Sequence, residues 1–406
     1  SQGRVRHWLS QFYQKRMGVF PPRDVKRVTG DWIATAAALE GEAGDRDGQP
    51  VPEEATVTRS TSVEESPRQH RRIELLDKPG IEPDDPMSEA GRKILRFHFR
   101  RMLYNEPGTR LGEDVEALHD MRVATRRMRA AFRVFGEYYR PKAAARYSKG
   151  LKRTGRALGA VRDLDVFRGK TQDYVETLPA SRRGGLDDFV SILEQQREAA
   201  RERMLVYLDS KKYLRFLDRF GRFVETEGLD SLVVTLDGDE PRPYHVRYVA
   251  PMAVFERLAN MRAYDEWVTI PNPPVARLHA LRIACKRLRY TLEFFKEVLG
   301  PDTKELIEEV VVMQDHLGEL QDAVVASGIL RDYLNWGTWD RSGTDRSRPS
   351  LAAPVIAPGV AAYLAAQQSE LEHLLETFPQ EWQRLTGPGF SQRVVGPSSM
   401  TSAMVL

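Results

Sequence analysis

From residue 85 onward, apolar residues recur at intervals of three and four positions, which is the period of an amphipathic α-helix. Proline and glycine residues divide this pattern into segments. The segments predict helices over residues 88–103, 112–139, 142–178, 186–227 (one helix or a pair), 245–267, 275–299, 302–335 and 358–386. We therefore expect an all-α protein with four antiparallel helices in each of two halves, about 85–227 and 245–386.

The remaining segments differ from these helices in composition. Residues 40–84 are rich in Gly, Pro, Ser, Asp and Glu, which predicts a disordered acidic linker. Residues 1–39 contain two short amphipathic pieces and stay unassigned, and residues 387–406 are predicted to be a flexible tail. In the first helix, Ser88 is the predicted N-cap, and the turn 106–108 is predicted to end the helix.

One predicted helix carries an unusual basic stripe. The segment 119–135 reads HDMRVATRRMRAAFRVF, and helical spacing puts five of its basic residues on one face: His119, Arg122, Arg126, Arg129 and Arg133. Neighbouring like charges on a helix cost about 0.2–0.5 kcal/mol per pair. A solvated face usually intersperses acidic residues to avoid this cost, so the stripe predicts an anionic ligand.

The same pattern occurs a second time over residues 279–295, HALRIACKRLRYTLEFF. Its stripe is His279, Arg282, Lys286 and Arg289, and Glu293 stands where the first copy has Arg133. A shorter repeat follows each copy: LGAVRDLDV at 158–166 and LGELQDAVV at 317–325. Two matched segments in the same order indicate an internal duplication.

Charge and cysteine content restrict the function classes. The net charge of the chain is only +3, but between residues 119 and 156 Asp120 and Glu137 are the only acidic residues. The single cysteine, Cys285, rules out a disulfide framework or a Cys-based metal site within one chain, which fits a reducing compartment. Because neither a transmembrane run nor a secretory signal is visible, we expect a cytoplasmic protein.

The guanidinium group of arginine forms paired hydrogen bonds with phosphate, so a row of such groups suits a phosphate polymer. The residues after the first stripe add basic groups at helical spacing, and Arg127 and Arg287 lie beside the stripes. The candidate polyanion-binding residues are His119, Arg122, Arg126, Arg127, Arg129, Arg133, Lys149, Lys152, Arg153, Arg156, His279, Arg282, Lys286, Arg287 and Arg289. The alternative is a solvated basic surface with structural ion pairs.

Other chemistries are open at this point. Asp163 and Asp322, the matched acids of the shorter repeat, are expected to orient a stripe arginine; alternatively, either serves a metal-dependent phosphohydrolase as a base. Gly159 and Gly318 are expected to let helices approach closely. No metal is expected at the histidines, because neither has a second ligand four residues later. A nucleic-acid scaffold would interleave aromatic and basic side chains, which the stripes do not do.

The two His-x-x-Arg motifs, each followed by Leu-Gly-x-x-x-Asp, resemble the CHAD family (conserved histidine α-helical domain) over about residues 86–386. The resemblance implies two tandem four-helix bundles related by a pseudo-two-fold axis, with a basic central groove. It also implies non-enzymatic binding of inorganic polyphosphate, association with polyphosphate granules, and no cofactor. A polyphosphate-metabolising enzyme is the expected protein partner, although the ExExK pattern of the CYTH triphosphatase domain, which often precedes CHAD domains, does not occur here.

Overall fold

The computed structural model describes residues 73–232, 244–268, 270, 273–337, 339, 355–387 and 389–390, all of which belong to one compact unit. Most of the described residues lie in helices, and none lies in a strand. The first half contains α3 (Met87–Leu111), α4 (Val115–Phe135), η1 (Gly136–Tyr138), α5 (Pro141–Thr177), α6 (Ala180–Arg183), η2 (Gly184–Leu186), α7 (Asp187–Asp209) and α8 (Lys211–Glu225). The second half contains α9 (Val246–Arg262), α10 (Asp265–Val268), α11 (Val275–Leu299), α12 (Thr303–Trp336) and α13 (Pro358–Thr386).

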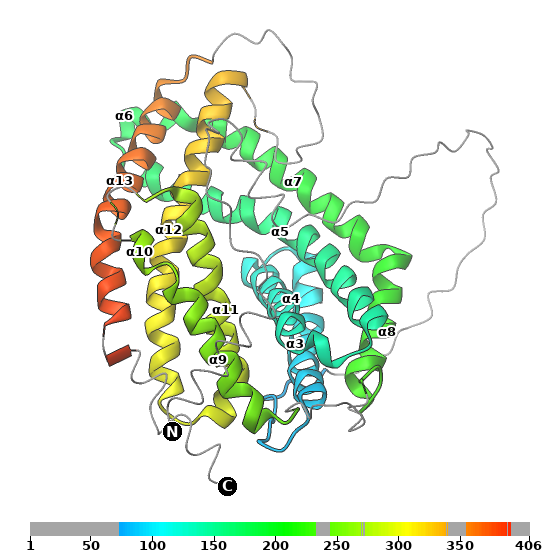
Figure 1. The fold of residues 1–406 in the computed structure, drawn as a ribbon. Coiled ribbons are helices and arrows are strands. Elements are labelled where there is room, and N and C mark those ends of the chain that lie inside the picture. Colours follow the sequence, from blue (N-terminus) through cyan, green and yellow to red (C-terminus); the bar gives the residue numbers. More distant parts are fainter. Residues whose placement is uncertain are drawn as a thin grey trace, which may run out of the picture. The chain divides into compact units, whose positions relative to one another are not determined.

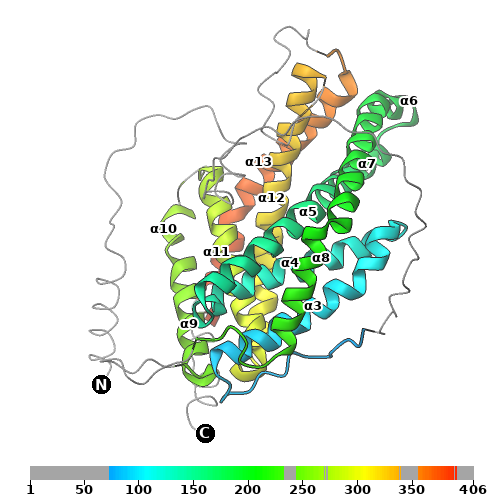
Figure 2. The ribbon, with the colours of Figure 1, turned by 90° about the vertical axis from the view of Figure 1, so that its right-hand side faces the viewer.

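The all-α prediction is confirmed, and the helices pack in the same order in both halves (Figure 1). In the first half α3 packs on α4, α4 on α5, and α5 on α7. In the second half α9 packs on α11, α11 on α12, and α12 on α13. Helix α8 also packs against α3, so the described first half has one long helix more than the four expected (Figure 2). None of the described helices is both long and apolar enough to cross a membrane.

The two helices that carry the basic stripes are bounded by local signals. Helix α4 begins after Asp114, whose carboxylate accepts a hydrogen bond from the backbone N–H of Glu116. Helix α11 follows Pro274 and ends at Gly300, whose φ of 93° an L-residue rarely adopts. The observed bounds of α11 match the predicted 275–299, whereas α4 is shorter at both ends than the predicted 112–139.

Both boundaries predicted for the first helix are wrong. Helix α3 begins after Pro86, so Ser88 lies inside it and does not cap it; its carbonyl accepts a hydrogen bond from the Tyr139 hydroxyl at 2.6 Å. The helix then continues through Pro107 and ends at Gly112, which has a φ of 78°. A helical proline removes one hydrogen bond, and here the packing of α3 on α4 outweighs that loss.

The end of the expected linker is part of the folded unit. Ile81 is only 5% exposed. The backbone N–H groups of Gly80 and Ile81 donate to the carboxylate of Glu297 on α11, at 3.1 and 2.9 Å. Residues 73–84 therefore lie against the helices, which their polar composition did not indicate. The unassigned segment 1–39, linker residues 40–72 and tail residues 391–406 lie outside the described part of the chain.

The two halves share an apolar contact where α4 packs against α11. Phe135 and Phe295, which occupy the same position in the two motifs, are fully buried with ring centroids 5.5 Å apart. Phe294 packs on Phe135 at 6.1 Å. This aromatic contact fixes the two stripe-bearing helices relative to each other, and so determines which of their basic residues meet.

Candidate functional site

Basic side chains from both stripes come together on the N-terminal side of the phenylalanines that form the aromatic contact. Lys286 on α11 lies within electrostatic range of four arginines, two from each helix. We call these five residues the cationic cluster: Arg122 and Arg126 from α4, and Arg282, Lys286 and Arg289 from α11. All five were predicted site residues, and their meeting across the two halves is a result of the fold.

Burial and mutual repulsion disfavour positive charge in the cluster. Burial lowers the pKa of the Lys286 ammonium from 10.5 to about 7, and the four neighbouring arginines add to this shift. Burial also lowers the pKa values of Arg126 and Arg282, and Arg289 repels both. The arginines remain charged at neutral pH, so the cluster concentrates positive charge where water is partly excluded.

Three members of the cluster form no direct bond to a carboxylate within the described residues. Within the described structure, no hydrogen bond or ion pair joins Arg126, Arg282 or Lys286 to another side chain. The Nε atoms of Arg122, Arg126, Arg282 and Arg289 are buried without an acceptor. Buried donors are normally satisfied, so the site has unused capacity to bind an anion.

Two glycines lie beside guanidinium groups of the stripes, and the nearest neighbours of a Cβ atom added to either would be atoms of an arginine side chain. A Cβ atom added to Gly159 on α5 would lie 3.5 Å from Arg122 Nε. A Cβ atom added to Gly318 on α12 would lie 3.2 Å from Arg282 Nη2. Both glycines and both arginines occupy matched positions of the two motifs, so the two halves seat an arginine in the same way.

The matched acids have different partners in the two halves. Asp163 accepts a hydrogen bond from Arg122 Nη2 at 3.1 Å, so its predicted role in orienting a stripe arginine is confirmed. Asp322 instead accepts from Lys170 of the first half at 2.9 Å. Asp322 still attracts Arg282 electrostatically, but the structure has no direct bond between them.

The exchange of Arg133 for Glu293 between the motifs produces opposite interactions at matched places. Glu293 forms ion pairs with Arg127 of α4 at 3.1 Å and with Arg289 at 3.6 Å. Arg287, which occupies the position of Arg127 in the second motif, lies near Arg133 instead. Burial is the largest cause of the lowered pKa of Arg287, and repulsion by Arg133 is the second. Arg127 is therefore held by a carboxylate between the halves, whereas Arg287 lies among like charges.

The two motif histidines also differ. The Nδ1 atom of His279 lies 2.8 Å from Gln321 Oε1, and this hydrogen bond orients the ring. His119 is half-buried, and burial together with the charge of Arg162 lowers its pKa. Arg162 lies between Gly159 and Asp163 on α5 and is not one of the residues predicted from the sequence.

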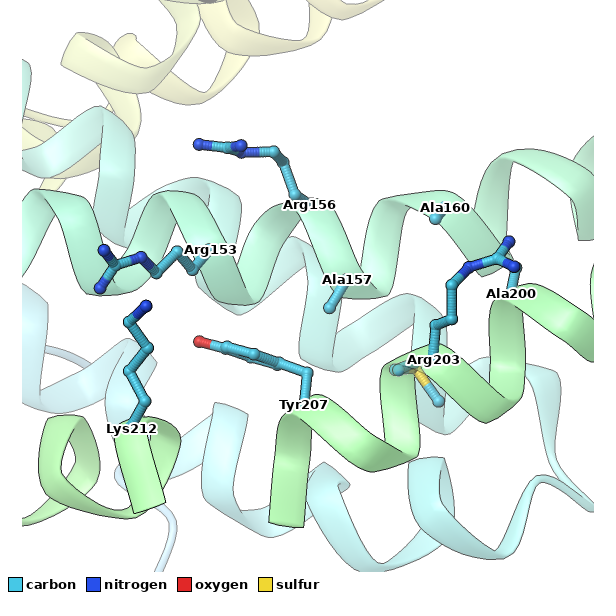
Figure 3. Close-up of a pocket in the computed structure, with 9 residues that line it drawn as sticks. Arg153, Arg156, Ala157, Ala160, Ala200, Arg203, Tyr207 and Lys212 are labelled. Atoms are coloured by element: carbon cyan, nitrogen blue, oxygen red, sulfur yellow. The ribbon is translucent and has the colours of Figure 1, made fainter. Parts of the chain in front are cut away.

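The predicted flanking residues on α5 are dispersed. Lys149 is exposed and Lys152 half-buried. Arg153 and Arg156 line a surface pocket of about 440 Å³ between α5, α7 and α8, together with Arg203 and Lys212 (Figure 3). Arg203 and Lys212 were not predicted from the sequence, because α7 and α8 carry no part of the repeated motif. The Arg129 side chain, on α4, lies beside Gly155 of α5. A Cβ atom added to Gly155 would be 3.5 Å from the guanidinium group of Arg129.

The sequence profile of the CHAD domain matches residues 93–331, which include both stripe helices. The chain belongs to the CHAD family. Two curated relatives from Mycobacterium tuberculosis, the uncharacterized proteins MT2285 (strain CDC 1551) and Rv2226 (strain H37Rv), are each 30% identical to this CHAD protein over 264 residues. That match covers 63% of the chain and 48% of each relative, so the chain spans about half the length of the curated relatives it matches.

Two solved structures share the fold of this CHAD protein. The CHAD domain from the plant Ricinus communis has a TM-score of 0.53 and 23% identity, covering 80% of this chain and 96% of that one. PptA from Streptomyces chartreusis has a TM-score of 0.53 and 17% identity, covering 74% of this chain and 100% of that one. At these identities the similarity supports the fold alone.

The described part of this CHAD protein contains no group of three or more His, Cys, Asp or Glu side chains that could hold a metal ion. Cys285 is fully buried in α11, and burial raises the pKa of its thiol to about 12. A thiol in that state is not a nucleophile near neutral pH. The groups available to a ligand at the cationic cluster are therefore hydrogen-bond donors and positive charges.

Proposed function

We propose that this CHAD protein binds inorganic polyphosphate, without catalysis of its own, along the contact between α4 and α11. The observation that carries the proposal is the enclosure of Lys286 by four arginines from both helices, with no carboxylate bonded to the lysine. An anion that enters the cluster neutralises charges that the fold has brought together at a cost. The internal duplication is part of the proposal, and the repeated packing order of the helices supports it.

A linear polyanion suits the site better than one compact anion. The stripe on α4 runs from His119 to Arg133, and at 1.5 Å per residue it spans roughly 20 Å. The cationic cluster occupies its middle, and Arg133 and Arg287 lie near each other beyond it. A chain of phosphates would contact these groups in succession, and the Arg122 guanidinium held by Asp163 is already oriented for such a contact.

Nucleic acid fits the site less well. Proteins that bind single strands stack bases on exposed aromatic rings. No aromatic ring of α4 or α11 is exposed: Phe135, Tyr290, Phe294 and Phe295 are at most 5% accessible, and the half-buried Phe132 packs on the core. The cluster therefore offers phosphate contacts and no surface for a base.

Hydrolysis would need a base and a site for a divalent metal, or an equivalent arrangement. Asp163 and Asp322 each form an ion pair, with Arg122 and Lys170 respectively. These pairs favour a structural role for both carboxylates, so the proposal is binding alone. Phosphate release from polyphosphate in the presence of Mg²⁺ or Mn²⁺, lost in Asp163→Asn or Asp322→Asn, would establish the hydrolase instead.

The test is a calorimetric titration with long-chain polyphosphate, duplex DNA and single-stranded RNA at one salt concentration. We expect polyphosphate to bind tightly and the nucleic acids weakly. Hydrogen bonds to charged groups contribute about 1.5–3 kcal/mol each, so the double substitution Arg122→Glu and Arg282→Glu should weaken polyphosphate binding by roughly 100-fold or more. The matched control is Arg168→Glu with Arg331→Glu, which reverses one exposed, unpaired arginine in each half.

Salt dependence gives an independent check. By analogy with single-stranded nucleic acids, neutralising five phosphates gives a slope of log affinity against log salt of about −3.5. Neutral substitution of two cluster arginines should reduce it to about −2. Equal binding of all three polymers, or equal losses in the cluster and control variants, would mean a general basic surface and not a polyphosphate site.

We also propose that the protein is cytoplasmic and associates with polyphosphate granules. A polyphosphate-metabolising enzyme is its expected partner there. A fluorescently tagged protein should collect at granules, and the Arg122→Glu, Arg282→Glu variant should stay dispersed. Persistence of the variant at granules would assign localisation to another part of the protein.

A further inference from the structure

A second basic site lies apart from the cationic cluster, on the side of α5 that faces α7 and α8. Its cationic residues are Arg153 on α5, Arg203 on α7 and Lys212 on α8 (Figure 3). The side chains of Arg153 and Lys212 point toward one another, and the Tyr207 hydroxyl points toward the same region. Arg156 also borders the pocket, but its side chain points away from α7 and α8.

These cations contrast with other basic residues of the same half. On neighbouring surfaces, Arg110 pairs with Asp209 at 2.6 Å, and Arg197 pairs with Asp165 at 2.5 Å. No hydrogen bond or ion pair is formed by Arg153, Arg203 or Lys212 within the described structure, and no acidic residue lines the pocket. Arg153 and Lys212 meet at one end of the pocket, whereas the exposed Arg203 side chain lies at the other end, beside Ala200 (Figure 3). Two like charges that meet without a carboxylate repel each other, and an anion bound between them relieves this repulsion.

The pocket combines these charges with an apolar wall. Ala200, Met204 and the Tyr207 ring line it, and the Tyr207 hydroxyl is hydrogen-bonded to Thr154 Oγ1 at 2.9 Å. That bond holds the ring in place between α5 and α7. The pocket volume of about 440 Å³ lies in the range of small-molecule sites.

We propose that this pocket binds a phosphoryl group, as a site separate from the cationic cluster. A phosphoryl group carries about −1.5 to −2 charges near pH 7, so Arg153 and Lys212 together balance one such group. The phosphoryl group comes either from the end of an inorganic phosphate chain or from a phosphorylated organic molecule. In the second case the organic part lies on Ala200, Met204 and the Tyr207 ring.

The experiment uses the full chain carrying Arg122→Glu and Arg282→Glu, so that the cationic cluster is disabled, and pyrophosphate as the probe. We expect pyrophosphate to bind this protein with one-to-one stoichiometry in calorimetry. Adding Arg153→Gln and Lys212→Gln should weaken binding at least tenfold. The matched control adds Lys211→Gln and Arg219→Gln, which removes two exposed charges from α8 outside the pocket and should change the affinity less than twofold.

Chemical labelling locates the bound probe. Pyrophosphate should protect the Lys212 amine from acetylation in the cluster-disabled protein, while the neighbouring Lys211 stays reactive. Tighter binding of adenosine diphosphate than of pyrophosphate identifies an organic phosphate as the ligand, and the reverse order identifies an inorganic chain end. The proposal is overturned if the cluster-disabled protein does not bind pyrophosphate, or if the pocket and control substitutions have equal effects. Neither result depends on whether the cationic cluster binds polyphosphate.

Discussion

The pKa of Lys286 predicts that polyphosphate binding weakens as the pH rises through neutrality. In the free protein this pKa is about 7, and Arg282, Arg126, Arg122 and Arg289 contribute to the shift after burial. A phosphate chain in the cluster attracts the protonated amine and raises its pKa again. Binding above pH 7 therefore takes up a proton, and the affinity depends on pH.

The size of the effect follows from proton linkage. If only the protonated lysine binds, the apparent affinity falls by up to about 50-fold between pH 7 and pH 9. Protonation of His119 also favours binding, but burial lowers the pKa of His119, so this effect acts mainly below pH 7. The terminal phosphates lose their last proton near pH 6, so the charge of the chain is nearly constant in this window.

The assay is polyphosphate titration of the wild type, Lys286→Met and Lys286→Arg at several pH values from 7 to 9 and constant ionic strength. Lys286→Arg keeps the charge at every pH, so it should bind tightly with little pH dependence. Lys286→Met should bind weakly throughout, also with little pH dependence. Two results would show that Lys286 does not control the pH dependence. One is a wild-type affinity that stays within twofold from pH 7 to pH 9, and the other is a Lys286→Met variant whose affinity depends on pH as strongly as that of the wild type.

The same shift has a consequence for stability in the absence of ligand. The pKa of Lys286 in the folded state lies below its unfolded value of 10.5, so protonated Lys286 carries a free-energy penalty in the folded state. That penalty is fully present below pH 7 and is relieved as the pH rises from 7 to 10.5. At about 1.4 kcal/mol per pKa unit it amounts to about 5 kcal/mol at most. Lys286→Met should therefore unfold at higher urea concentration than the wild type at pH 6, and this difference should shrink at pH 9.

Two further predictions test packing and charge placement. Replacing Glu293 by Gln removes the ion pairs of Arg127 and Arg289, and should lower the free energy of unfolding by about 1–3 kcal/mol. The same change should strengthen polyphosphate binding, because two more cations become available. An unchanged affinity would show that Glu293 does not keep these two arginines from binding the ligand. Replacing Gly359 by Ala places a Cβ atom 2.3 Å from the carbonyl oxygen of Gly185, so urea unfolding should show a loss of about 1–3 kcal/mol. At Gly169 in α5 the same Cβ would meet nothing within 4 Å, so Gly169→Ala should stabilise by up to about 1 kcal/mol. Equal effects at the two glycines would contradict the packing of η2 on α13.

The helical period of the sequence determined which residues lie along one face of each helix. The bounds of α11 followed from Pro274, the apolar period and Gly300, and the two basic stripes followed from steps of three and four residues. Local signals were weaker where packing competes with them. Helix α3 passes through Pro107 because its contact with α4 outweighs one lost hydrogen bond.

Which helix faces meet depends on tertiary packing. The contact of Phe135 with Phe295 brings Arg122 and Arg126 to Lys286, although the two motifs begin 160 residues apart. The same packing pairs Arg127 with Glu293 and brings Lys212 of α8 close to Arg153 of α5. The helical period determines in which direction a side chain points from its own helix. The burial of apolar faces between distant helices determines which residues become its neighbours. Residue types and spacing therefore identified the stripes, and the packing of the two halves set the electrostatics of the site.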